Sequence, residues 1–112
     1  QMHELKTLLA IAPQYAIWDD HDFGPNDSDR SFNNKDLSKE QFDLFWSNPP
    51  QAHPDLQGVT NLFDWSDSQF FLLDNRYNRA PNERLDGDRT MLGTLQLEWF
   101  KEALLNSHQL VY

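Results

Sequence analysis

The sequence predicts an α/β fold that is incomplete within these 112 residues. Segments with apolar residues at helical spacing alternate with short apolar runs typical of buried strands, and loops rich in Gly, Pro, Asn and Asp separate them. The chain has the length of one small domain, and its shares of 38% hydrophobic and 13% aromatic residues are typical of a globular protein. These observations favour a folded unit with a buried core.

The first third of the chain predicts a helix followed by a strand. Apolar residues fall near helical spacing from His3 to Ala12, and Pro13 ends the pattern. The aromatic and β-branched run Tyr15 to Trp18 is typical of a buried strand, and Asp19 to Asp22 follow at its carboxyl end. In α/β proteins that end of a strand is where functional sites are placed.

A loop and a second helix come next. Phe23 to Asp36 is rich in turn-forming residues and predicts a loop. Ser38 and Gln41 fit a capping box, so the sequence predicts a helix with Ser38 as its N-cap that ends before Pro49.

The middle of the chain predicts an antiparallel hairpin. Its arms are Thr60 to Trp65 and Gln69 to Asp74, and the second arm is apolar enough to be the central strand. The segment Asn75 to Thr90 carries four arginines among Asn, Asp, Gly and Pro. It predicts a long exposed or ligand-facing loop.

The last third of the chain predicts a helix over Gly93 to Ser107 with Thr94 as N-cap. Leu110, Val111 and Tyr112 then begin a strand. Because no partner element follows that strand, we expect the sheet to continue in a longer parent protein.

Charge and composition limit the classes of partner. A formal charge of −9 repels the backbone of a nucleic acid, so nucleic acid is not expected as a partner. No apolar run reaches the roughly 18 residues of a membrane span. The absence of cysteine excludes disulfides and thiolate ligands for zinc.

The segment WDDHD, residues 18–22, contains the residues best suited to metal binding or acid–base catalysis. It places the carboxylates of Asp19, Asp20 and Asp22 around the imidazole of His21. Carboxylate oxygens suit divalent and trivalent metal ions, and an imidazole can bind a metal or transfer protons near neutral pH. The alternative is a set of solvated residues at the top of a loop, in which the aspartates only cap a turn.

Three separated segments together resemble the alkaline phosphatase D (PhoD-like) family of metallophosphoesterases. They are WDDHDFGPNDSD at residues 18–29, FFLLDNRYNRAP at residues 70–81 and MLGTLQLEWFKEALLNS at residues 91–107. The second is similar to the family's L-D-x-R-x-x-R segment, and the third to its L-G-x-x-Q-x-x-W-[LF] helix. They occur in the order of the family, so the chain resembles the middle portion of that catalytic domain.

The resemblance implies a calcineurin-like metallophosphoesterase sandwich, in which two mixed sheets are flanked by helices. It implies two or more metal ions (calcium, iron, zinc or manganese) and the hydrolysis of phosphomonoesters or phosphodiesters. The family is usually exported, which implies a secreted or periplasmic parent protein.

Matching the motifs residue by residue implies roles for six side chains. Asp20 corresponds to a metal ligand, and His21 to the imidazole that stabilises or protonates the departing oxygen. Asp19 and Asp22 would not bind the metal directly: Asp19 would support His21 or a metal ligand, and Asp22 would orient a neighbouring side chain. Arg76 and Arg79 would hold the phosphoryl group of the substrate, and the alternative for each is a structural ion pair, for instance with Asp74.

A two-metal centre needs about six to eight ligands, and this chain offers one cluster. We therefore expect residues 1–112 to be a partial domain that is inactive alone. The alternative is a non-catalytic acidic module that binds calcium through the loop FGPNDSD, residues 23–29, or mediates protein association. Exposed sheet edges could also lead the chain to form a homo-oligomer.

Overall fold

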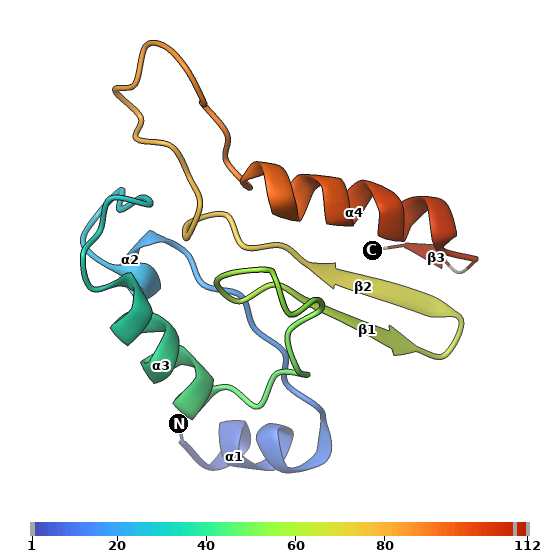
Figure 1. Ribbon diagram of the computed structural model, residues 1–112. Helices are drawn as coiled ribbons and strands as arrows, with labels where there is room; N and C mark the ends of the chain where they lie inside the picture. The colour runs from blue at the N-terminus through green and yellow to red at the C-terminus, as the bar shows by residue number, and fades with distance from the viewer. Residues whose placement is uncertain (1, 109, 112) are drawn as a thin grey trace.

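The structure is a computed structural model, and it describes residues 2–108 and 110–111. The described helices are α1 (Met2–Ile11), α2 (Asp20–Phe23), α3 (Lys35–Phe45) and α4 (Thr94–Asn106), and the strands are β1 (Asn61–Trp65), β2 (Ser68–Leu72) and β3 (Leu110–Val111). Helix α4 lies along the sheet, whereas α2 and α3 pack together away from it (Figure 1). This mixture of helices and a small sheet agrees with the α/β class expected from the sequence.

The sheet has the order β1-β2-β3. Strands β1 and β2 form an antiparallel hairpin in which Asn61 pairs with Leu72. Strand β3 runs parallel to β2, with Leu110 opposite Ser68. The predicted hairpin and the central position of its second arm are thus confirmed. The final strand is confirmed for its first two residues, and Tyr112 lies outside the described residues.

The strand predicted over Tyr15–Trp18 is wrong. This segment is neither helix nor strand, because no other strand within the described residues pairs with it. The carboxamide of Asn48 takes that place: its Nδ2 donates to the carbonyl oxygen of Ala16 at 2.7 Å, and its Oδ1 accepts from the Ala16 N–H at 3.0 Å. A side chain therefore satisfies the backbone groups that a neighbouring strand would bind.

Helix α2 is a single turn, where the sequence predicted the end of a strand followed by a loop. Asp19 is its N-cap, and the backbone N–H of Asp19 donates to Asp22 Oδ2 at 3.2 Å, as in a capping box. The helix ends at Gly24, whose N–H donates to the carbonyl oxygen of Asp20 at 2.7 Å. The acidic segment therefore lies on a helical turn and not at the end of a strand.

Two predicted helix caps are also wrong. Helix α3 begins at Lys35 with Asn34 as N-cap, and the Ser38 hydroxyl instead donates to the carbonyl oxygen of Phe23 at 2.6 Å. Helix α4 is confirmed, but its N-cap is Gly93, one residue before Thr94. Gly93 has φ +81°, a left-handed conformation that a glycine adopts without strain.

The hydrophobic core lies where α2 and α3 meet the segments on either side of the hairpin. Its buried members are Trp18, Phe23, Phe42, Val59 and Tyr77. The ring of Trp18 packs edge-on against Phe23 and Phe42, with centroids 5.1 and 5.4 Å away. Burial, together with a hydrogen bond to Asp36, raises the pKa of Tyr77 to about 12.

A second group of aromatic side chains joins β2 to α4. It consists of Phe71 with Trp99 and Phe100.

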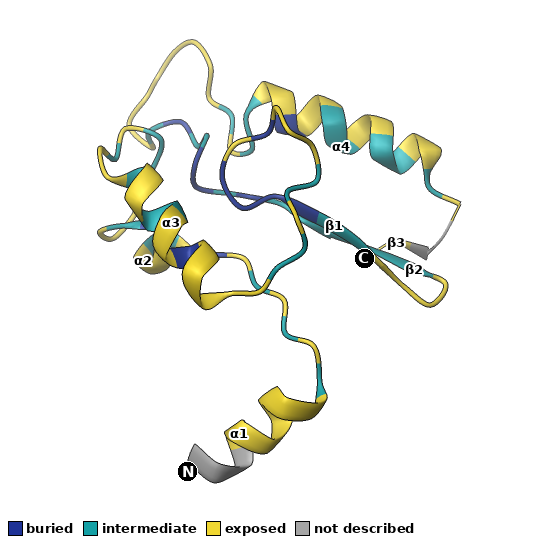
Figure 2. Ribbon diagram, turned by 60° about the horizontal axis from the view of Figure 1, so that its bottom comes forward, coloured by how far each residue is buried: buried dark blue, intermediate teal, exposed yellow. Residues whose placement is uncertain are grey.

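Large apolar side chains remain uncovered on α1 and on the outer face of α3. Figure 2 shows α1 and much of α3 in the colour of exposed residues. Leu8 and Leu9 are half exposed, and Leu44 and Phe45 are more than 70% exposed. The accessible surface is 7922 Å², compared with roughly 6,400 Å² for a self-contained monomer of this mass. The described chain thus buries less of its surface than an independent domain does. No helix within its described residues has the length and apolar character to span a membrane.

We predict that Gly58→Ala destabilises the fold more than Gly87→Ala. Both glycines have positive φ, so each alanine should cost about 1–2 kcal/mol of backbone strain. At Gly58 the new Cβ would lie only 1.9 Å from Asp74 Oδ2, whereas at Gly87 it would meet the movable end of Arg84. Urea unfolding of both variants measures the difference, and equal losses of stability would contradict the tight packing of Gly58 on Asp74.

Candidate functional site

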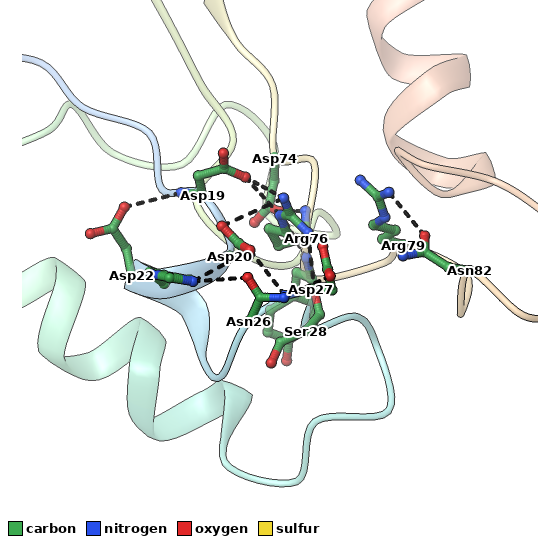
Figure 3. Close-up of polar contacts among 12 residues, drawn as sticks. Asp19, Asp20, Asp22, Asn26, Asp27, Ser28, Asp74, Arg76, Arg79 and Asn82 are labelled. Atoms are coloured by element: carbon green, nitrogen blue, oxygen red, sulfur yellow. Dashed lines mark hydrogen bonds and ion pairs between the residues drawn. The ribbon is translucent and has the colours of Figure 1, made fainter.

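The acidic segment lies at the surface, directly after a buried anchor. Trp18 is 1% exposed, whereas the side chains of Asp19 and His21 are 66% and 74% exposed. Figure 3 shows the polar side chains of this segment and of the loop after β2. The core therefore fixes one end of the segment, whereas Asp19 and His21 face solvent and the side chain of Asp20, between them, is 20% exposed.

Asp20 is held by the turn that follows α2. Its Oδ2 accepts a hydrogen bond from the backbone N–H of Asp27 at 2.9 Å. That bond, with smaller contributions from His21 and Arg76, lowers the pKa of Asp20 below its usual value, although burial opposes the shift. Its Oδ1 lies 3.9 Å from Arg76 Nη2, beyond hydrogen-bond distance. Asp20 therefore offers one carboxylate oxygen to a ligand.

His21 is bound on one side of its ring. Its Nε2 lies 3.1 Å from Asn26 Oδ1 and 3.8 Å from Asp20 Oδ2. Because Asn26 Nδ2 donates to Asp27 Oδ2 at 2.7 Å, Asn26 Oδ1 is the acceptor and His21 Nε2 donates to it. The imidazole is thus oriented by Asn26 and 74% exposed, so a bound molecule could approach it from the solvent side.

Arg76 joins the first motif to the second across 57 residues of sequence. Its Nε lies 2.8 Å from Asp19 Oδ1, and its Nη2 contacts the same oxygen. Arg76 is 8% exposed, so the ion pair lies on the side of the acidic segment that faces the protein interior. The structure thus gives Arg76 the ion pair that the sequence left open as an alternative, with Asp19 as partner in place of Asp74. Whether Arg76 also binds phosphate stays a prediction.

Asp74 is fully buried and serves the backbone around it. Its Oδ1 accepts from the N–H groups of Arg76 and Tyr77, each at 2.8 Å. Its Oδ2 accepts from the N–H of Val59 at 2.9 Å. The start of the loop after β2 is therefore a tight, buried turn, whereas the sequence predicted a long exposed or ligand-facing loop over Asn75 to Thr90.

Gln96, the glutamine of the L-G-x-x-Q-x-x-W pattern, connects the third motif to the second, a role that the sequence did not predict. It is 1% exposed on α4. Its Nε2 donates to the carbonyl oxygen of Asp74 and its Oε1 accepts from the N–H of Asp74, both at 2.8 Å. The signal in the sequence is a polar residue inside the third motif at the helical spacing of Trp99 and Phe100, which pack on Phe71 of the sheet.

Arg79 lies apart from the acidic segment. Its Nη2 donates to Asn82 Oδ1 at 3.0 Å, and Figure 3 shows the side chain directed toward Asn82. Among the described residues its guanidinium makes no polar contact with the segment Asp19–Asp22. The structure therefore brings Arg76 to the candidate site, and the side chain of Arg79 does not reach it in this conformation.

The carboxylates of the segment face different partners. Asp19 binds Arg76, Asp22 binds the backbone of its own turn, and Asp20 binds the Asp27 N–H. Within the part of the chain that the structure describes, no group of three or more His, Cys, Asp or Glu side chains is arranged to hold a metal ion. The free oxygen of Asp20 is the type of donor that hard metals bind, and the metal site stays a prediction.

Comparison with protein-family models, with curated proteins and with solved structures gives no significant match to this chain. The functional assignment therefore depends on the motifs and on how the structure arranges them.

We predict that Arg76→Met lowers the free energy of unfolding by about 1–2 kcal/mol, because it removes a charge-assisted hydrogen bond at a buried side chain. The matched control is Arg79→Met, which loses only the contact with Asn82 and should change stability by less than about 0.5 kcal/mol. Chemical denaturation measures both values. Equal effects would show that the Asp19 pair contributes nothing specific.

We predict that acid releases the turn at residues 20–27. The folded-state pKa of Asp20 is lowered, so its stabilisation is complete above the unfolded pKa of about 3.9 and is lost as the pH falls through the folded value. The amide resonance of Asp27 should shift with a midpoint below that of an ordinary aspartate. Asp20→Asn should remove this step, and a midpoint at or above the ordinary value would contradict the prediction.

Proposed function

We propose that residues 1–112 are part of a PhoD-like, metal-dependent phosphoester hydrolase that cleaves phosphomonoesters or phosphodiesters. One observation carries the proposal: the three segments that resemble the family are bound to one another by their characteristic polar residues. Asp19 of the first binds Arg76 of the second, and Asp74 of the second binds Gln96 of the third. If the three resemblances were coincidental, there would be no reason for these particular side chains to bind one another.

The proposal gives Asp20 and His21 separate roles. Asp20 would bind a calcium, iron, zinc or manganese ion through its free Oδ1, and the bound metal would supply a Lewis acid and an activated water. His21 would stabilise the departing oxygen by a hydrogen bond from Nε2 or, as an imidazolium, protonate it and become a neutral imidazole; in either case the Nε2–H would exchange its contact with Asn26 for the substrate. Asp19 and Asp22 would keep this pair in place through Arg76 and the capping of α2.

The two arginines differ in what they offer a phosphoryl group. Arg76 is committed to Asp19, so it could bind phosphate only by sharing or exchanging that carboxylate. Among the described residues, the guanidinium of Arg79 binds only the amide of Asn82, and a rotation of the Arg79 side chain would release it. Phosphate binding by this loop is therefore easier for Arg79 than for Arg76, provided that the Arg79 side chain turns toward the metal.

The uncovered apolar faces support an origin in a larger domain. Leu44 and Phe45 on α3 are exposed although they are of the type that folds bury. We propose that further elements of a calcineurin-like sandwich cover them and supply the remaining metal ligands. Activity would then belong to the parent protein, of which residues 1–112 carry one part of the site.

The proposal predicts metal-dependent hydrolysis by the parent protein that contains this sequence. An aryl phosphate monoester and diester are the probes, and each is assayed before chelation, after chelation and after metal is restored. His21→Asn should lower kcat by about 10²–10⁴-fold, the usual contribution of a proton donor. Asp20→Asn should raise the metal concentration needed for half activity.

The matched control is His53→Asn, since this imidazole lies in another loop beside Asp55. It should leave the activity unchanged. Hydrolysis that survives chelation, or an Asp20→Asn protein that equals wild type, would refute the proposed function.

A further inference from the structure

We infer that Gln96 is a positioning residue that fixes the Asp19–Arg76 pair, and with it the start of α2, although it touches neither Asp19 nor the guanidinium of Arg76. The inference concerns geometry and goes beyond the proposed function. Only its effect on turnover rests on that function.

The first step is the complete use of the Gln96 carboxamide. Its two N–H groups donate to the carbonyl oxygens of Asp74 and Leu92, each at 2.8 Å. Its oxygen accepts from the Asp74 N–H and from the Thr60 hydroxyl. A primary amide has two donors and two acceptor sites, so every capacity is filled. Rotating the amide by half a turn would place its NH2 group against the Asp74 N–H and its oxygen against the carbonyl oxygens of Asp74 and Leu92. The side chain therefore has one favoured orientation.

The second step is the transfer of this constraint to Asp74. Gln96 binds both backbone groups of Asp74, just as a neighbouring strand would, although β2 has already ended at Leu72. With its backbone fixed, the Asp74 carboxylate is aimed at the N–H groups of Arg76 and Tyr77. The direction in which the chain leaves β2 is thereby determined.

The third step leads from the turn to the acidic segment. Arg76 extends from this turn, and its side chain is 9% exposed where it meets Asp19. Asp19 is the N-cap of α2, so its position determines where the next residues, Asp20 and His21, begin. A shift of Asp74 would therefore move the ion pair first, and Asp20 and His21 with it.

Packing alone does not explain a glutamine at this position. The neighbouring residues on the same face of α4 are the apolar Trp99 and Phe100, and a methionine would fill a similar volume without the cost of burying an amide. What a methionine would lack is the set of four hydrogen bonds. The identity of the side chain is thus explained by what it orients.

Hydrogen exchange of the Arg76 Nε–H, observed by NMR in the whole chain, tests the inference, because this proton is bound to Asp19. Gln96→Met should speed its exchange by about tenfold or more, the usual effect of losing a buried hydrogen-bond network. The control Phe100→Leu loosens the packing of α4 on Phe71 and leaves the amide untouched. It should keep the exchange within about twofold of wild type under conditions where both variants are folded.

A second variant keeps the test decisive if Gln96→Met does not fold. In Gln96→Glu the protonated carboxyl can donate to the Asp74 carbonyl and accept from its N–H, whereas the ionised form faces two carbonyl oxygens. Relative to wild type at the same pH, protection of the Arg76 Nε–H should be kept at low pH and lost as the new carboxyl ionises. A pH-independent ratio, unchanged exchange in Gln96→Met, or an equal loss in Phe100→Leu would overturn the inference.

The same variants separate this inference from the proposed function. If the exchange responds as expected and the parent protein has no phosphoesterase activity, the geometric inference stands and the proposed function fails. If the parent is active and Gln96→Met changes neither the exchange nor kcat, the function stands and the inference fails.

Discussion

The conformation of Asp74 is the constraint on which the rest of the structure depends. Its side chain is fully buried, and a buried carboxyl group costs free energy unless hydrogen bonds replace those it makes to water. Three backbone N–H groups replace them, so the segments before β1 and after β2 are held around one side chain. Because Gln96 binds the backbone of Asp74 at the same time, the sheet, α4 and the following loop meet at one residue.

This arrangement supports the acidic segment on its buried side and leaves its other side exposed to solvent. Arg76 and Trp18 are buried beneath it, whereas His21 extends into solvent. A functional group on a loop is positioned well only if the residues that support it are themselves fixed by packing and hydrogen bonds. The described residues meet this requirement for Asp20 and His21 even though the carboxylates nearby face separate partners.

Local patterns in the sequence predicted the helices α1, α3 and α4 and the antiparallel hairpin, since each depends mainly on neighbouring residues. The expected arrangement of three carboxylates around His21 is not found, because Asp19, Asp20 and Asp22 each bind a different partner. The strand at Tyr15–Trp18 was predicted wrongly, because pairing depends on a second strand that no local pattern supplies. The ion pair of Asp19 with Arg76 joins residues 57 positions apart, and periodicity carries no information on it. The cap at Ser38 failed for a similar reason, as the hydroxyl binds the distant carbonyl of Phe23.

The pairing of Asn48 with Ala16 gives the segment before α2 two unequal sides. One carboxamide binds both backbone groups of Ala16, so these groups point the same way and that side is closed. In an extended chain the backbone groups of the next residue, Ile17, point the opposite way, and no described residue binds them. A further strand could therefore pair with this segment only on the side of the Ile17 backbone groups. The side occupied by Asn48 is closed to such pairing, so a sheet could extend from this segment in one direction only.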